Sequence, residues 1–146
     1  MQPNIHINWL AVAVSVVASF AIGGVWYGPI FSKTWAKAMG FAAGAKPSGR
    51  EIAQGSVLNL LGLVLTAFVL AHEVVVWRPS TWGAGVDGAP GVYGFFAAFF
   101  IWIGFVVPIL LNGVAFERKS WKVFAINAGY QLISLLVMAM VLSFWR

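Results

Sequence analysis

The stretch from Glu51 to Trp77 limits what this chain can fold into more than any other part of the sequence. It is mostly apolar over more than the roughly 20 residues that a helix needs to cross a lipid bilayer. Because a helix surrounded by lipid has no reason to gather its polar groups on one side, we expect the polar face of this stretch to pack against other helices. That face is defined by helical spacing and contains Gly55, Asn59, Gly62, Thr66 and Glu73.

Three further runs are as long and as apolar, and the chain carries little charge. Hydrophobic residues make up 61% of the sequence and charged residues only 9%, whereas soluble domains average about 25% charged. The length of 146 residues suits one domain, and four spans with their loops nearly exhaust it. We therefore predict an all-α polytopic membrane protein, a bundle of four transmembrane helices over residues 7–28, 52–77, 92–116 and 121–145.

Small residues and prolines give the first and third spans further features. Pro29 predicts that the first helix ends near Gly28. Pro108 predicts a kink in the third helix, or a carbonyl at Gly104 that is free for another partner. A ridge on the first span allows another helix to approach closely, since every fourth residue belongs to it: Ala11, Ser15, Ser19, Gly23 and Tyr27.

The distribution of Lys and Arg indicates how the chain is oriented in the membrane. Aromatic and apolar residues at helical spacing in residues 31–44 also predict a short helix in the interface there. Because loops rich in Lys and Arg remain in the cytoplasm, we expect both termini to lie outside the cytoplasm, across the plasma membrane. The first and third loops hold Lys33, Lys37, Lys46, Arg50, Arg118 and Lys119, with Lys122 just inside the last span, and the opposite side holds Arg78 and Arg146.

This topology sorts the polar residues into two groups by depth. The first group is expected near the cytoplasmic side, where it forms a polar layer and a candidate ligand site: Tyr27, Asn59, Asn112, Asn127, Tyr130 and Gln131. The second is expected near the outer surface as a candidate titrating site: His72, Glu73 and Asn8. Both groups have a simpler interpretation, because amides in a membrane also form hydrogen bonds between helices and Glu73 can reach the surface or Asn8.

The sequence disfavours several classes of function. It contains no cysteine, so disulfides and thiolate sites are excluded. Neighbouring residues on a helix point about 100° apart, so His72 and Glu73 cannot easily chelate one metal ion, and we predict no metal site and no cofactor. No nucleophile motif, phosphate-binding loop or spaced carboxylate pair occurs, so an enzyme is disfavoured. The basic residues flank hydrophobic segments, so we do not expect nucleic acid as a partner.

Two loops share a weak similarity that points to an internal repeat. Lys33-Thr34-Trp35 and Lys119-Ser120-Trp121 have the same pattern, and each follows a span with a proline near its cytoplasmic end. Two helical hairpins in parallel orientation, related by an axis along the membrane normal, would produce this pattern.

Several stretches along the chain resemble one family of small, mostly bacterial, integral membrane proteins that is catalogued as a domain of unknown function. The resemblance implies a four-helix membrane domain, here in a bacterial inner membrane, and it implies no activity, substrate or cofactor. The stretches are Asn8-Trp9, the WYGPIF of residues 26–31, the PILLN of residues 108–112, Trp121-Lys122 and the INAGYQ of residues 126–131.

Two functions from different classes remain open. The first is binding or permeation of a small solute or ion through the polar layer. The second is a structural or accessory role, in which the chain packs against a larger membrane complex or acts as a homo-oligomeric scaffold. Under either hypothesis the lipid bilayer is a partner, and we expect the chain to assemble as a homo-oligomer. The ridge of the first span and small residues such as Gly24 and Gly28 offer more packing surface than one bundle needs.

Overall fold

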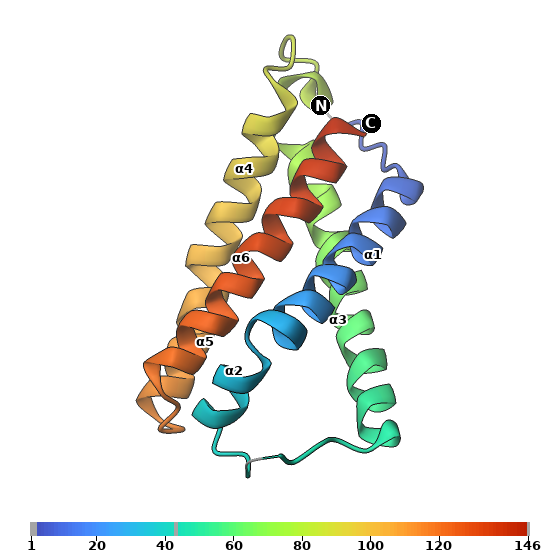
Figure 1. Ribbon diagram of the computed structural model, residues 1–146. Coiled ribbons are helices and arrows are strands. Elements are labelled where there is room, and N and C mark those ends of the chain that lie inside the picture. Colours follow the sequence, from blue (N-terminus) through green and yellow to red (C-terminus); the bar gives the residue numbers. More distant parts are fainter. Residues whose placement is uncertain (1–2, 43, 146) are drawn as a thin grey trace.

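A computed structural model describes residues 3–42 and 44–145, and the described chain is helical, with no strand. Four helical segments are long and apolar enough to cross a membrane: Trp9–Ile30, Gly49–Val76, Pro90–Ala115 and Trp121–Phe144. They pack side by side, which confirms the predicted all-α fold with four spans (Figure 1). Both ends of the chain lie at one end of the bundle, which we call the terminal end; the opposite end is the loop end (Figure 1).

The first span is helix α1, Trp9–Val25, extended by a wide π-type turn, η1, over Trp26–Ile30. The side chain of Asn8 accepts hydrogen bonds from the backbone N–H groups of Leu10 and Ala11, so it caps the start of α1. As predicted, helical geometry breaks near Gly28: this residue has φ of −92° and ψ of −105°, and the chain kinks there just before Pro29.

Helix α2, Ser32–Ala38, is the observed part of the segment that was expected at the interface. It is shorter than residues 31–44 because Gly40 adopts a left-handed conformation, with φ of +80°, just after the last turn. Residue 43 of that segment and Arg146 of the orientation argument lie outside the described residues. Helix α2 packs against the last span.

Helix α3, Gly49–Val76, begins earlier than expected because Ser48 and Glu51 form a capping box. The backbone N–H of Ser48 donates to Oε2 of Glu51 at 2.7 Å, and the backbone N–H of Glu51 donates to Oγ of Ser48 at 3.3 Å. A short 3₁₀ turn, η2, Pro79–Trp82, starts the loop that leads to the third span.

The third span consists of α4, Pro90–Ile101, a π-type turn η3, Trp102–Val106, and α5, Val107–Ala115. The distortion predicted from Pro108 is present, and it lies in the turn before the proline. The nitrogen of Pro108 carries no hydrogen, so it cannot donate to the carbonyl of Gly104. The wider π-type turn accommodates this missing hydrogen bond. The fourth span, α6, Trp121–Phe144, is capped by Ser120, whose Oγ accepts from the N–H of Val123.

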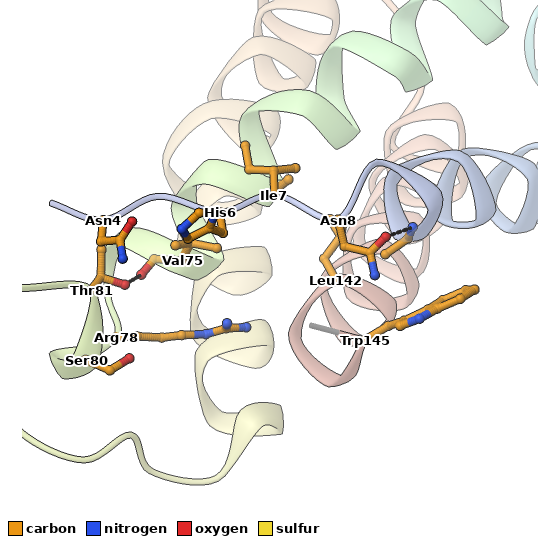
Figure 2. A pocket seen from close by; sticks show the side chains of 12 residues that line it. Asn4, His6, Ile7, Asn8, Val75, Arg78, Ser80, Thr81, Leu142 and Trp145 are labelled. Carbon is orange, nitrogen blue, oxygen red and sulfur yellow. Dashed lines mark hydrogen bonds between the residues drawn. The ribbon is translucent and has the colours of Figure 1, made fainter.

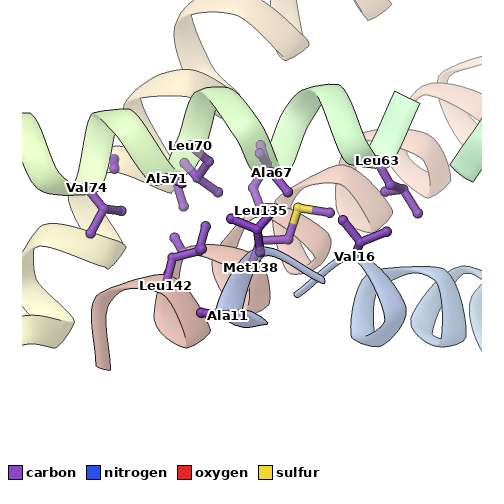
Figure 3. Close-up of a cluster of buried hydrophobic side chains, with 14 residues drawn as sticks. Ala11, Val16, Leu63, Ala67, Leu70, Ala71, Val74, Leu135, Met138 and Leu142 are labelled. Carbon is purple, nitrogen blue, oxygen red and sulfur yellow. The ribbon is translucent and has the colours of Figure 1, made fainter. Parts of the chain in front are cut away.

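The hydrophobic core lies in the terminal half of the bundle and is contributed by α1, α3, α4 and α6 (Figure 3). Leu70, Val74, Met138 and Ala139 have no exposed surface. Small residues bring the helices together: a Cβ added at Gly94 would lie 2.8 Å from the carbonyl oxygen of Ala139. Such close approach is typical of helices that pack in lipid. No hydrophobic driving force brings helices together there, so van der Waals contact between them has to do so.

The loop half of α3 leaves this bundle. Its residues 49–62 are exposed apart from Ser56, and its ribbon diverges from α1 and α6 (Figure 1). A Cβ at Gly55 or Gly62 would meet nothing within 4 Å. The expectation that the polar face of α3 is its packed face is therefore wrong within one chain. The buried face lies roughly a quarter-turn away on the helix, at Leu63, Ala67, Leu70, Ala71 and Val74.

Candidate functional site

Asn127 on α6 is the centre of the polar layer. Its Oδ1 accepts a hydrogen bond from the hydroxyl of Tyr27 at 2.8 Å and another from the indole N–H of Trp35 at 3.2 Å. Tyr27 lies in η1 and Trp35 in α2, so one amide joins three elements at the loop end. The turn at η1 makes this possible, because it redirects the chain and brings α2 back against α6.

Two tryptophans attach the first and third spans to α6 at nearly the same level. The indole N–H of Trp26 donates to the carbonyl of Ile126 at 3.0 Å, and that of Trp102 donates to the carbonyl of Ala128 at 2.8 Å. Each tryptophan is the first residue of a π-type turn. These indoles hold α6 between the two spans, and they satisfy their own donors away from water.

Tyr130 occupies the inner side of the polar layer. Its ring meets the ring of Tyr27 edge to face at 5.2 Å, and its hydroxyl would lie 3.0 Å from a Cβ at Gly23. The residue is 5% exposed, and its hydroxyl has no hydrogen-bond partner of acceptable geometry among the described residues. The side chains of Asn59 and Ser134 do interact with this hydroxyl electrostatically. Asn59 is exposed, so the hydroxyl is next to the open side of the bundle.

The structure brings together four members of the predicted layer, which are Tyr27, Asn127, Tyr130 and Asn59. Asn112 is exposed on α5, and Gln131 is half-buried on α6. Neither amide takes part in the hydrogen bonds of the layer in the described part of the chain. Gln131 follows Asn127 by one turn of α6 and so lies on a similar face of that helix, but it stays outside the hydrogen bonds of the layer.

The three members of the predicted titrating site are used separately. Nδ1 of His72 lies 2.7 Å from the carbonyl oxygen of Phe68, and Oε2 of Glu73 accepts from the indole N–H of Trp77 at 3.3 Å. Both contacts stay within α3, while Asn8 caps α1. Within residues 3–42 and 44–145, no three His, Cys, Asp or Glu side chains are grouped closely enough to hold a metal ion.

A pocket of about 350 Å³ lies at the terminal end and is hereafter the end pocket. Its walls come from the segment before α1, the end of α3, the loop after it and the end of α6 (Figure 2). Arg78 lines it and is only 7% exposed. The remaining lining residues are Asn4, His6, Ile7, Asn8, Ala11, Ala71, Val75, Ser80, Thr81, Leu142 and Trp145.

The family model described as "Protein of unknown function (DUF1761)" matches residues 10–143 of the chain. The chain belongs to the DUF1761 family. The resemblance noted from the sequence is thereby confirmed. No curated protein and no solved structure matches the chain. The family description names no activity, so any role for this DUF1761 protein has to be argued from its own side chains.

Sequence reasoning missed three participants in the DUF1761 sites. Trp35 was assigned to the interfacial segment and Arg78 only to the orientation argument, and no place in the layer was predicted for Trp102. A signal existed for Trp102, because a tryptophan in mid-membrane needs a partner for its N–H. For Arg78 the only signal that could have predicted a place in a site was its position, directly after a span and before a loop rich in Gly and Pro.

Proposed function

We propose that this membrane protein binds a small, neutral, polar solute in the polar layer, between α1, α3 and α6. The observation that supports the proposal is the buried Tyr130 hydroxyl without a well-formed hydrogen bond. A buried polar group left in that state costs about 1–3 kcal/mol. A solute that forms a hydrogen bond with the hydroxyl removes this cost, and the recovered free energy contributes to the binding of the solute.

The residues around the hydroxyl favour a neutral solute over an ion. A tyrosine hydroxyl and an asparagine amide each donate and accept hydrogen bonds. Asn59 and Ser134, the side chains that interact with the hydroxyl, carry no formal charge. A solute bearing hydroxyl or amide groups matches this set, whereas an ion in the membrane needs several aligned oxygen ligands or an opposite charge.

The exposed half of α3 provides the way in. Asn59 is exposed, and Gly55 and Gly62 on the same face have open space beside them. A solute can therefore approach from the loop end without displacing a packed side chain. Permeation requires more, because Leu70, Leu135 and Met138 close the terminal half of the bundle. The proposal is accordingly binding, with passage only through a second conformation in which that core opens.

Native mass spectrometry of protein purified in mild detergent tests the proposal. We expect the wild-type protein to retain a bound small molecule, and Tyr130→Phe and Asn59→Leu to lose it. Asn112→Leu is the matched control, since it removes an exposed amide outside the layer and should leave the bound mass unchanged. If the wild-type protein carries no bound mass and Tyr130→Phe raises the melting temperature, the hydroxyl is only a cost to folding and the proposal fails.

A homo-oligomeric scaffold is the second candidate, and the same half of α3 supports it. In lipid, glycines allow two helices to approach closely, and an exposed amide gains from a partner across the contact. A two-fold contact would pair Gly55, Asn59 and Gly62 with the same residues of a second copy. Gly55→Leu should dissociate such an oligomer, and light scattering in detergent measures the change in its mass. A stoichiometric foreign subunit on purification would instead indicate an accessory role.

We propose that both termini lie outside the cytoplasm of a bacterial inner membrane. The support is the concentration of Lys and Arg in the two loops of the loop end. A reporter enzyme that works only outside the cytoplasm should be active when it is fused to the C-terminus. Activity of a cytoplasmic reporter at the same position would reverse the orientation and place the end pocket on the cytoplasmic side.

A further inference from the structure

The end pocket is separate from the polar layer and has a different chemistry. It lies at the terminal end, between the segment before α1 and the ends of α3 and α6 (Figure 2). Its volume of about 350 Å³ is in the range of sites for small ligands. Ile7, Ala11 and Leu142 give it an apolar wall, while Asn4 and Thr81 add polar groups from the segment before α1 and from η2.

The electrostatics of the pocket favour an anion. Arg78 is buried, and its guanidinium donates through Nη2 to the carbonyl of Ser143 at 3.3 Å. A guanidinium has five N–H donors in a flat fork that matches phosphate oxygens. The N-terminus of α1, the positive end of its dipole, opens on the same pocket beside His6. None of the described lining residues is Asp or Glu; the carboxylate of Asp87 does contact the lining, because its Oδ1 accepts from the backbone N–H of Ser80 at 3.0 Å.

The surrounding tryptophans place the pocket at the depth of lipid headgroups. Trp9, Trp77, Trp82 and Trp145 are exposed around the terminal end, and tryptophan gathers at the boundary between hydrocarbon and water. A ligand at this depth can keep an anionic group on Arg78 and lay an apolar portion against Ile7 and Leu142. The pocket thus matches an amphipathic molecule with an anionic head.

We propose that the end pocket binds a phosphate ester, with Arg78 as the residue that contacts the phosphate and His6 at the mouth. The phosphate belongs either to an anionic phospholipid or to a soluble ester such as a polyol phosphate. The chemistry is the same in both cases: oxygen atoms of the phosphate accept hydrogen bonds from the N–H groups of the guanidinium. This site does not depend on the solute proposed for the polar layer.

Variants must separate binding from folding, because Arg78 also caps the last turn of α6 through Ser143. His6 provides the separation, since it is exposed and none of the described hydrogen bonds or ring contacts involves it. His6→Glu introduces a negative charge at the pocket mouth, and His6→Gln is the matched neutral control. Arg78→Lys keeps the charge and removes the fork of donors.

The experiment measures thermal unfolding by tryptophan fluorescence in maltoside detergent and phosphate-free buffer. Three probes are titrated: phosphatidylglycerol, diacylglycerol with the same acyl chains but no phosphate, and glycerol 3-phosphate with no acyl chain. We expect phosphatidylglycerol or glycerol 3-phosphate to raise the melting temperature and diacylglycerol to leave it unchanged. Stabilisation by phosphatidylglycerol alone identifies a lipid, and stabilisation by glycerol 3-phosphate as well identifies a soluble ester.

The variants decide where the phosphate binds. His6→Glu should weaken the apparent affinity at least tenfold, Arg78→Lys should weaken it by a similar factor, and His6→Gln should stay within twofold of the wild-type protein. The proposal is overturned if neither phosphate probe stabilises the protein, if diacylglycerol stabilises it equally, or if His6→Glu and His6→Gln respond alike.

Discussion

Helix α3 passes through two different surroundings, although leucine and valine occur in both of its halves. From Leu63 to Val74 it buries five side chains against α1, α4 and α6. From Val57 to Gly62 every residue is exposed. The buried half packs leucine and alanine against its neighbours, whereas the exposed half leaves leucine uncovered together with glycine and asparagine. In lipid, contact area and close fit decide which part of a helix packs, and polar residues alone do not hold it in place.

The largest expected effect tests whether the buried half carries the stability. Leu70→Ala should lower the free energy of unfolding by about 2–4 kcal/mol, because Leu70 has no exposed surface and the cavity cannot fill easily. Leu61→Ala, at a side chain that is 55% exposed, should cost less than about 0.5 kcal/mol. Unfolding by titration with sodium dodecyl sulfate measures both. Equal costs would show that the two halves are equally packed.

The next effect concerns close approach of helices. Gly94→Ala should cost about 1–3 kcal/mol, because its Cβ would lie 2.7 Å from Oγ of Ser143 and 2.8 Å from a backbone carbonyl. Gly62→Ala, with open space around it, should be neutral or stabilise the helix by about 0.5 kcal/mol. The same titration compares them. A destabilising Gly62→Ala would mean that another molecule covers this half of α3 in the membrane.

A smaller effect is expected in the polar layer. Asn127→Ala removes the acceptor of Tyr27 and Trp35, and hydrogen bonds between membrane helices average about 0.6 kcal/mol each, so the cost should be about 1 kcal/mol. Asn112→Ala should change stability by less than the error of the measurement. A shift in tryptophan emission should accompany Asn127→Ala as α2 is released. An unchanged spectrum would argue against the contact of α2 with α6.

The smallest perturbation is a spin label, and it sharpens the comparison between the halves. The sequence has no cysteine, so single cysteines can be introduced at Val57 and at Val76 without background. Val57 is 66% exposed, and a nitroxide there should be mobile in paramagnetic resonance spectra of the protein in lipid, whereas one at Val76 should be restricted. A restricted label at Val57 that becomes mobile in Gly55→Leu would favour the oligomer over the open solute site.

Part of the candidate site could be predicted from the sequence. Tyr27, Asn127 and Tyr130 were expected at one depth, and they do meet, because depth follows from span length and from the orientation of alternate helices. Asn112 and Gln131 were expected there on the same grounds and do not join. For Asn112 the reason is that depth is a property of the position along a helix, whereas contact also needs the rotation of the helix about its axis. Helices that are apolar on all sides give little sequence signal for that rotation. Gln131 is on nearly the same face of α6 as Asn127, so rotation does not explain its absence from the layer.

The hydrogen bond from Trp35 to Asn127 depends on a feature that the sequence shows even less clearly. The π-type turn of η1 redirects the chain after Pro29 and returns α2 to α6. A proline predicts an interruption, but the direction of the chain after it depends on what the following residues can pack against. The end pocket is a stronger example, because three stretches that are distant in sequence line it.

By itself the sequence determined the four spans and the distortion before Pro108 in the third span. These depend on local physics: the length of apolar runs against bilayer thickness and the missing N–H of Pro108. The caps formed by Asn8, Ser48 and Ser120 are equally local, because each side chain lies next to the first N–H groups of its helix, but only the structure revealed them. Only the tertiary structure decided that α3 buries its leucine face, that Asn59 is next to Tyr130, and that Arg78 lines a pocket. The reason is that helix rotation and divergence in lipid result from the fit of many small contacts between spans, and no single residue encodes that sum.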